Sequence, residues 1–590
     1  MRWNDLLARV LSSARPTFKR FWVSICFTVA LTTTLIMSTP NRFSGSTSIQ
    51  TLNRLSLAFV AGLLASWCAV LFYERWLWEK KQTGSELTGN LAALLSGGLV
   101  AAVTYPMLQE FTLVSMSRHA AICIFLFLAF FVIPCFRRED RLEMYAVKLF
   151  TQAVLAALFS AVAFIGLASI TFTVSSLFSL KMSFDIYLHI WMVMAGVLAP
   201  FLLMAGIPAA GDPVENEDYP KTLKNLIVYV VTPLLTAYTL VLFVYFAKIL
   251  ITRQWPVGLV SHLVLWYSLV TIAILYFVWP LSPTNKWADM FSRYFPRAVI
   301  PLLAMMFLSI GIRIRYYGIT ENRYYVTVVG AWVLGSVLYL NLTKKRRSVI
   351  LPASLALVVA LSVFGPWSSF AVSKWSQNRR LESLLTKYNM VADNSIVPSS
   401  QAVTQTDRQE MAEVLFYFDR FHNLSDVRLL PAGFTMSQFE STFGFSYADA
   451  GYPAKPRPQV YYEAANQALD ISGYRYLFDY TKINYGQPSA VTLTQGNVQT
   501  SYNRESQLIS VTLGGNLEWE QSLTDYVKGL TAKYAQEDRV QLLPEDMVLE
   551  AVGANLRVRV VITGLWGEED PLTDKINLGQ VGFYVLVGDK

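Results

Sequence analysis

The chain has 590 residues, of which 54% are hydrophobic and 15% are charged, so it is not a soluble protein along its whole length. The formal net charge is +8, but it is divided unevenly. Residues 1–371 hold 30 basic and 15 acidic residues, and residues 372–590 hold 19 basic and 26 acidic residues. The high net charge therefore gives no argument for nucleic-acid binding, because positive charge at the edge of a membrane is attracted to anionic lipid.

Residues 1–20 are basic and precede an apolar run, which superficially resembles a signal peptide. No small-residue cleavage site follows the run, so we predict an uncleaved first span. Apolar residues recur in this segment at helical spacing. The pattern favours a short amphipathic helix on the cytoplasmic leaflet over a frayed polar tail. The residues in question are Trp3, Leu6, Leu7, Val10 and Leu11.

Eleven apolar runs fill residues 21–371. A helical span needs about 20 apolar residues at 1.5 Å rise each, and each run is about that long. We therefore predict an α-helical polytopic membrane bundle of about 11 spans. The runs are Phe21–Ser38, Leu55–Tyr73, Thr88–Tyr105, His119–Phe136, Leu149–Thr173, Ile186–Ile207, Leu226–Ile251, Leu259–Leu281, Ala298–Ile312, Tyr324–Leu342 and Val349–Ala371.

Charges in the connecting segments predict the orientation of the bundle. With the N-terminus in the cytoplasm, the inner segments carry 21 of the 30 basic residues and the outer segments carry 9. This asymmetry follows the positive-inside rule. An odd number of spans then places everything after Ala371 outside the cytoplasm. The four cysteines, Cys26, Cys68, Cys123 and Cys135, lie in the predicted spans without metal-ligand or redox spacing, so no cofactor or metal is expected.

Polar residues gather between the ninth and tenth runs, in Arg313–Tyr325, against the positive-inside trend. Arginine on that face needs a partner, and its planar fork suits a carboxylate or a phosphate. We expect the arginines to order this loop, with Glu321 as the nearest partner and the acidic C-terminal region as the next. Two interpretations stay open: an interfacial belt with internal ion pairs, or a binding or docking site. The candidate site residues are Arg313, Arg315, Tyr317, Glu321, Asn322, Arg323, Trp255 and Gln377.

Several strings between Tyr219 and Asn389 are distinctive: YPKTLKNL, WPVGLVS, NKW, RIRYYGITENRYY, FGPW and SQNRRLESLL. On these strings the chain resembles a bacterial membrane family known as domain-of-unknown-function family 4153. The resemblance implies a polytopic protein of the bacterial cytoplasmic membrane with an extracytoplasmic tail. It implies no activity, because the family has no established function or catalytic residues.

The region after Ala371 is predicted to be an extracytoplasmic α+β domain in two parts. Residues 372–449 form a helical neck, with helices at Lys374–Tyr388 and Arg408–Phe421 and a short helix at Thr435–Thr442. Residues 450–590 form a β-rich part that begins with a proline-rich linker, Ala450–Tyr461, and contains one helix, Glu518–Tyr534. Its expected strands are Tyr474–Tyr480, Ala490–Leu493, Gln507–Leu513, Leu556–Thr563 and Gly582–Val587.

Motifs of the common enzyme classes are missing from the sequence, including the nucleophile elbow, the P-loop and the zinc-protease helix. His422 lies beside Asp419 and Asp426, and a solvated helix end is the simpler interpretation of that group. Two functions remain. The first is a non-enzymatic envelope protein whose exported domain binds a protein partner or senses the envelope. The alternative is a permease or lipid-handling transporter for an anionic ligand.

Overall fold

The computed structural model describes residues 3–39, 47–82, 84–135, 142–178, 183–209, 219–253, 259–343, 347–392, 395–399, 401–447, 459–464, 469–481, 490–533, 540–570 and 575–590. The chain divides into two units. The membrane unit comprises Met1–Ser383 and Phe418–Arg428, and the C-terminal unit comprises Leu384–Tyr417 and Leu429–Lys590.

Within these described ranges, ten helices of the membrane unit are long and apolar enough to cross a bilayer, with α6, η2 and α7 together counted as one and α8, η4 and α9 as another. Helix α1 bends at Phe21, where the amphipathic N-terminal segment was predicted to meet the first span. The helical elements are α1 (Trp3–Ser38), α2 (Thr47–Glu79), α3 (Glu86–Met107), α4 (Leu113–Val132), α5 (Leu142–Leu177), α6 (Asp185–Val193), the π-helical segment η2 (Met194–Leu198), α7 (Ala199–Ala205), α8 (Lys221–Leu226), the π-helical segment η4 (Ile227–Val231), α9 (Thr232–Thr252), α10 (Leu259–Val278), α11 (Lys286–Tyr317) and α12 (Glu321–Leu342).

The eleventh predicted span is not confirmed at its full length. The run Val349–Ala371 forms α13 (Ile350–Val363), an apolar helix of 14 residues, followed by a break and by α14 (Ser369–Lys387). The break falls at Gly365, whose φ is +84°, and at Pro366. Glycine permits that backbone conformation and proline has no N–H for a helix, so the run cannot continue as one helix.

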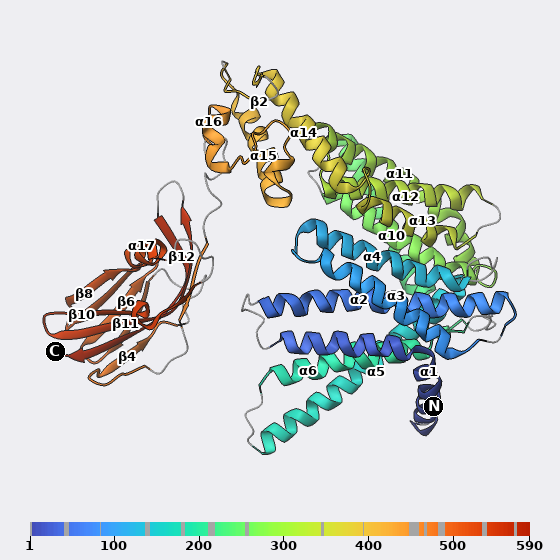
Figure 1. Ribbon diagram of the computed structural model, residues 1–590, viewed down its shortest axis with the longest axis horizontal. Coiled ribbons are helices and arrows are strands. Elements are labelled where there is room, and N and C mark those ends of the chain that lie inside the picture. Colours follow the sequence, from blue (N-terminus) through green and yellow to red (C-terminus); the bar gives the residue numbers. More distant parts are fainter. Residues whose placement is uncertain are drawn as a thin grey trace. The chain divides into compact units, whose positions relative to one another are not determined.

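Two large buried apolar cores hold the described membrane helices together, and a smaller one joins α4, α13 and α14. One joins α1, α2, α4, α5 and α7, and includes Phe21, Trp67 and Phe130. The other joins α9 to α12, and includes Val264, Leu302 and Val333. Figure 1 shows α10 to α13, in green to yellow, as one group and α1 to α4, in blue, as another. Helix α5 contributes residues to both cores.

The predicted neck helices are present. Helix α14 (Ser369–Lys387) covers its expected range except for Tyr388, α15 (Gln405–Phe421) covers its range, and α16 (Phe439–Phe443) overlaps the expected short helix. The short strands β1 (Val391–Ala392) and β2 (Ser395–Ile396) pair antiparallel. Of the predicted linker Ala450–Tyr461, residues 450–458 lie outside the described residues, and its last three belong to strand β3.

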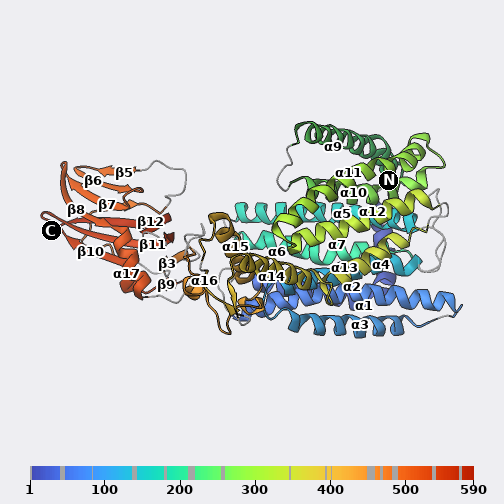
Figure 2. The same cartoon turned by 90° about the horizontal axis from the view of Figure 1, so that it is seen from above.

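The β-rich region contains two sheets that share one core (Figure 2). The six-stranded sheet has the order β4-β12-β11-β3-β9, with β10 also paired to β11, and the four-stranded sheet has the order β5-β6-β7-β8. The middle of β11 is buried on both faces of the sheet, since Val560 and Ile562 on one face and Val561 on the other are at most 1% exposed. The strands are β3 (Gln459–Ala464), β4 (Tyr476–Asp479), β5 (Ala490–Gln495), β6 (Val498–Asn503), β7 (Leu508–Leu513), β8 (Asn516–Ser522), β9 (Val540–Leu542), β10 (Val548–Val552), β11 (Leu556–Asp570) and β12 (Lys575–Asp589).

The predicted helix Glu518–Tyr534 is wrong in its first turn. Helix α17 covers Leu523–Lys533, and Asn516–Ser522 is strand β8. Gly514 and Gly515 both have positive φ, +55° and +89°. Two such residues form the tight turn that joins antiparallel strands, so β8 pairs with β7 and the helix starts only after it.

Candidate functional site

The candidate site is built around the turn between α11 and α12. Gly318 ends α11 with φ +67° and ψ −177°, and its N–H donates to the carbonyl of Ile314 at 2.9 Å. This backbone conformation is essentially restricted to glycine. A Cβ at Gly318 would also lie 3.0 Å from Nε2 of Gln377 and 3.2 Å from Oγ of Ser376. The turn is therefore tight because α14 lies directly against it.

Three side chains satisfy backbone groups that the turn leaves free. Gln377, which is only 2% exposed, donates from Nε2 to the carbonyls of Tyr317 and Ile319, each at 3.1 Å. The Ile319 N–H donates to Oγ of Ser376 at 2.8 Å. Arg323 donates from Nη1 to the carbonyls of Tyr317 and Gly318, at 3.0 and 2.8 Å. The last carbonyls of a helix lack intrahelical partners and attract a cation, so Arg323 and Gln377 stabilise the end of α11.

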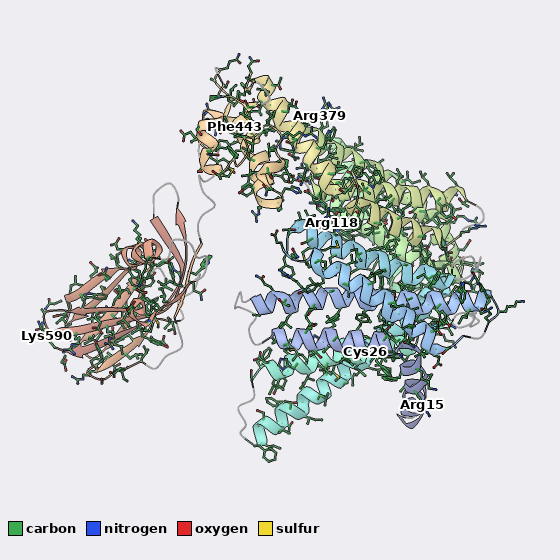
Figure 3. The ribbon with its side chains drawn as sticks, viewed as in Figure 1. Arg15, Cys26, Arg118, Arg379, Phe443 and Lys590 are labelled. Carbon is green, nitrogen blue, oxygen red and sulfur yellow. The ribbon has the colours of Figure 1, made fainter. Side chains whose placement is uncertain are left out.

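The next residues of α14 hold the segment Phe418–Arg428 of the membrane unit. Asn378 donates from Nδ2 to the carbonyl of Asp426 at 3.0 Å, and its Oδ1 accepts from the N–H of Arg428 at 2.9 Å. Lys374 forms an ion pair with Asp426 at 2.6 Å. One stretch of α14, residues 374–378, thus binds the α11–α12 turn on one side and the 418–428 segment on another. Figure 3 shows the side chains along α14, on which Arg379 is labelled.

A direct contact joins the same two segments. Oε1 of Glu321, the first residue of α12, lies 2.7 Å from Nε2 of His422. The His422 side chain is fully buried and that of Glu321 is 11% exposed. The imidazole also lies against the rings of Phe370 and Phe418, with centroids 6.4 and 6.0 Å away. The prediction of a solvated helix end at His422 is therefore wrong.

Two tyrosines of α12 add contacts to the start of α14. Tyr324 donates from its hydroxyl to the carbonyl of Trp367 at 2.6 Å, and the hydroxyl of Tyr325 accepts from Oγ of Ser369 at 3.0 Å. We call the whole arrangement the junction: the α11–α12 turn, residues 367–378, and the segment 418–428. Each of these three parts is bonded to the other two.

Comparison with known proteins places the sequence in a family. A family model described as "Domain of unknown function (DUF4153)" matches residues 18–395, which is more than half of the chain. The chain belongs to this family. It is also similar to an uncharacterized protein, PM1469, of Pasteurella multocida (strain Pm70), with 22% identity over 281 residues, or 47% of this chain and 48% of the relative. The chain thus spans about half the length of that curated relative. No solved structure matches.

The DUF4153 match contains the α11–α12 turn and all of α14, but it ends before His422 and before the two sheets of the β-rich region. The chain is a multi-pass membrane protein by its ten long apolar helices and its family. Neither the description of the family nor that of the relative states an activity.

The structure separates the predicted site residues into groups. Tyr317, Glu321, Arg323 and Gln377 lie together in the junction, and the guanidinium of Arg323 is 5.5 Å from the ring centroid of Tyr317. Asn322 is exposed and contacts α10 instead, with Nδ2 3.4 Å from Nε2 of His262. Trp255 falls outside the described residues.

Arg313 and Arg315 do not show the expected contacts. Arg313 is half-buried and Arg315 is exposed in the last turn of α11. Among the residues that the structure describes, neither takes part in a hydrogen bond or an ion pair. The expected pairing of these two arginines with Glu321 is therefore wrong, while a positive charge near the C-terminal end of α11 still interacts favourably with the helix dipole.

Several residues of the junction are not among the predicted site residues, including Lys374, Ser376, Asn378 and His422. The local sequence Ser376-Gln377-Asn378 could have indicated these contacts, because hydroxyl and amide side chains within an amphipathic helix favour hydrogen bonds to nearby backbone groups. Nothing local in the sequence relates His422 to Glu321, because 101 residues separate them.

The junction is rich in hydrogen bonds from side chains to backbone carbonyls, among them those of Gln377, Arg323 and Asn378. No group of three or more His, Cys, Asp or Glu side chains capable of holding a metal occurs among the described residues. The arrangement can fix two helices, α14 and α15, relative to the α11–α12 turn.

Proposed function

We propose that the chain is a non-enzymatic protein of the bacterial cytoplasmic membrane that binds a protein partner or senses the envelope through its C-terminal unit. In this proposal the N-terminus is cytoplasmic and the C-terminal unit is extracytoplasmic. The support for that orientation is the excess of basic residues in the inner segments, 21 against 9.

One observation carries the proposal. Helices α14 and α15 each begin or end in the junction and continue without a break into the C-terminal unit. A load or a ligand on that unit acts on the membrane helices through these two helices. The buried Glu321–His422 contact and the Gln377 hydrogen bonds make the junction stiff, so a displacement of either helix is passed to the α11–α12 turn.

The alternative of a permease for an anionic substrate gains little from the membrane helices. One cavity among the described membrane helices has a volume of about 390 Å³, and no charged side chain lines it. An anionic substrate needs hydrogen-bond donors or positive charge in its site. The apolar lining favours the lipid-handling form of the alternative over the form that carries a hydrophilic anion.

Site-specific photo-crosslinking in living cells tests the binding function. Leu477 on β4 and Leu517 on β8 are exposed apolar residues, 48% and 60% accessible. With a photoreactive amino acid at either position, we expect a discrete adduct with an envelope protein. The matched control is the same amino acid at Leu158 on α5, an exposed residue of a membrane helix. The absence of an adduct from Leu477, Leu517 and further exposed positions of the sheets would contradict the proposal.

A further inference from the structure

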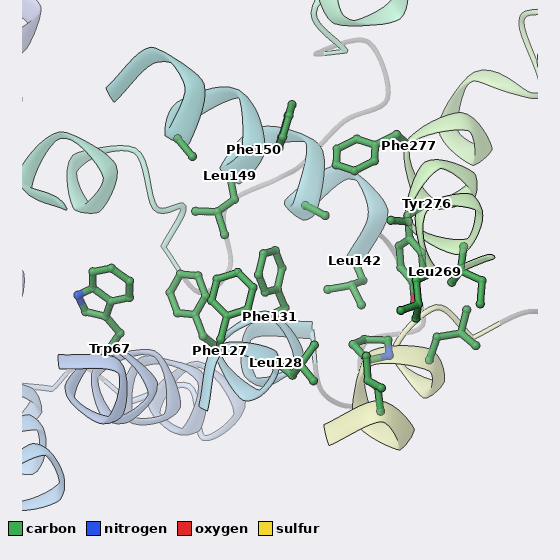
Figure 4. A pocket seen from close by; sticks show the side chains of 18 of the residues that line it. Trp67, Phe127, Leu128, Phe131, Leu142, Leu149, Phe150, Leu269, Tyr276 and Phe277 are labelled. Carbon is green, nitrogen blue, oxygen red and sulfur yellow. The ribbon is translucent and has the colours of Figure 1, made fainter. Parts of the chain in front are cut away.

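The membrane helices enclose a cavity that the proposed function does not use. Its volume is about 390 Å³ and its walls come from α2, α4, α5, α7, α10, α12 and α13. Figure 4 shows aromatic rings on several sides, among them Phe127, Phe131 and Phe277. The cavity lies between the two apolar cores, since Trp67 and Leu149 belong to one core and Ile272 and Leu351 to the other. Its volume lies within the range of small-ligand pockets.

The lining residues lie toward one end of the bundle. They include the last turns of α4 and α10 and the first turns of α5 and α13. The floor is deep, because Phe130, Leu142 and Leu149 are only 1%, 2% and 4% exposed. The mouth is open, because Phe127 and Phe150 are 49% and 45% exposed on the surface of membrane-spanning helices. The cavity therefore opens sideways, where hydrocarbon chains of lipid lie.

Polar groups that could hold water are nearly all used. Tyr276 donates its hydroxyl to the carbonyl of Ser348, and Trp332 donates Nε1 to Oγ of Ser354 at 3.0 Å. The remaining polar side-chain atom of the lining is Nε1 of Trp67, a single buried donor without a partner among the described residues. A buried water needs two to four polar partners, so water does not fill this space.

An empty cavity of this size is costly, because every void removes contacts from its walls and the cost grows with its volume. The volume exceeds the roughly 150 Å³ of an engineered apolar cavity that stays dry and accepts apolar ligands. Lipid hydrocarbon is the apolar medium that surrounds membrane helices. We propose that one acyl chain of a membrane phospholipid enters through the mouth at Phe127 and Phe150 and fills this cavity.

The direct test uses the unaltered full-length chain in nanodiscs of phosphatidylethanolamine and phosphatidylglycerol. A small fraction of the phospholipid carries a photoreactive diazirine in the middle of one acyl chain. After illumination, mass spectrometry locates the adducts on the protein. We expect adducts on the floor residues Phe130, Leu142 and Leu149, which the surrounding lipid cannot reach from outside. Adducts confined to outward-facing residues such as Leu158 and Val162 would overturn the proposal.

Variants that fill the cavity provide the second arm. Ala146 and Ala153 both line it from α5, so Ala146→Phe and Ala153→Phe place a ring in the space of the acyl chain. The matched control is Leu158→Phe on the same helix, an exposed position outside the lining. We expect floor adducts to fall at least fivefold in both cavity variants and to stay unchanged in the control. Equal labelling of the floor residues in all four proteins contradicts an acyl chain at this position. If a variant does not fold, the labelling of the unaltered chain alone decides the proposal.

Discussion

Nε2 of His422 lies 2.7 Å from Oε1 of Glu321, and the two residues are 101 positions apart in the sequence. The histidine is fully buried and the carboxylate nearly so, so removal of either residue takes a buried polar contact away from the other. A hydrogen bond to a charged group contributes about 1.5–3 kcal/mol. The Glu321–His422 contact is therefore expected to hold the segment 418–428 in place.

Glu321→Ala and His422→Ala should each loosen that segment. At 1.4 kcal/mol per factor of ten, a loss of about 1.5–3 kcal/mol raises local amide exchange roughly 10- to 150-fold. Hydrogen exchange of residues 418–428 in nanodiscs measures the effect. The control is His262→Ala, because His262 contacts the same turn through the exposed Asn322 and its removal should change exchange little. Equal exchange in all three variants would show that the buried contact does not hold the segment.

Gly318 should not tolerate a side chain. Gly318→Ala strains a backbone conformation that costs other residues about 1–3 kcal/mol, and its Cβ meets Nε2 of Gln377 at 3.0 Å. We expect faster proteolysis of the α11–α12 turn in membranes. Gly311→Ala in the same helix is the control, because a Cβ there meets no other atom within 4 Å. That variant should be neutral or stabilising, since alanine favours a helix over glycine.

The three arginines of the turn should behave differently. Arg323→Ala removes two hydrogen bonds to the carbonyls of Tyr317 and Gly318, and should cost about 1–2 kcal/mol. Arg313→Ala and Arg315→Ala remove no hydrogen bond or ion pair among the described residues, and surface changes of this kind stay within about 0.5 kcal/mol. Limited proteolysis near Lys374–Arg380 measures all three. If cleavage accelerates equally in all three variants, the three arginines contribute equally to the stability of the turn and the prediction is wrong.

The sequence was sufficient to predict the elements that have a regular hydrophobic periodicity. Ten of the eleven apolar runs became long helices, and α14 and α15 matched their predicted ranges, because hydrophobic periodicity acts over a few turns. The eleventh predicted span, Val349–Ala371, was too long because Gly365 and Pro366 end the helix within it. Strand β6 was missed altogether, since Val498–Asn503 is mostly polar and owes its strand to its neighbours.

The candidate site was harder to predict for a different reason. Tyr317, Arg323 and Gln377 were predicted as site residues because polar and basic residues are uncommon next to the outer ends of membrane spans. The hydrogen-bond acceptors of Arg323 and Gln377 are backbone carbonyls, which no sequence pattern identifies. Glu321 was expected to pair with an arginine close in sequence, whereas its carboxylate contacts His422, which lies beyond α14 in the chain. Contacts of such long sequence separation depend on the fold and not on local residue choice.

The neck should lose stability at low pH through Asp407. Burial raises the pKa of this carboxyl, but hydrogen bonds from Lys387, Tyr388 and Thr404 outweigh it and hold its pKa below the ordinary value of 3.8. A lowered pKa stabilises the fold at any pH above 3.8, and this contribution is lost as the pH falls through the folded value. We expect amide protection in 384–417, corrected for intrinsic exchange, to be constant from pH 7 to 5 and to fall only below about 3.8.

Asp407→Asn is the control for that pH dependence. It keeps the shape of the side chain but has no ionisable group, so its protection should be lower at pH 7 and should vary less at low pH. A profile in Asp407→Asn that parallels the unaltered protein would mean that other carboxyl groups determine the acid sensitivity of the neck.

The orientation of the C-terminal unit depends on α13. Its 14 residues span about 21 Å as a helix, which is shorter than the roughly 30 Å of bilayer hydrocarbon. A short span is accommodated by local thinning of the bilayer at modest cost, and four basic residues, Lys344 to Arg347, precede it. We therefore expect reporter fusions after Lys345 to be cytoplasmic and fusions after Ser399 to be extracytoplasmic. If both reporters lie in the cytoplasm, α13 does not cross, the C-terminal unit faces the cytoplasm, and the proposed role in the envelope is wrong.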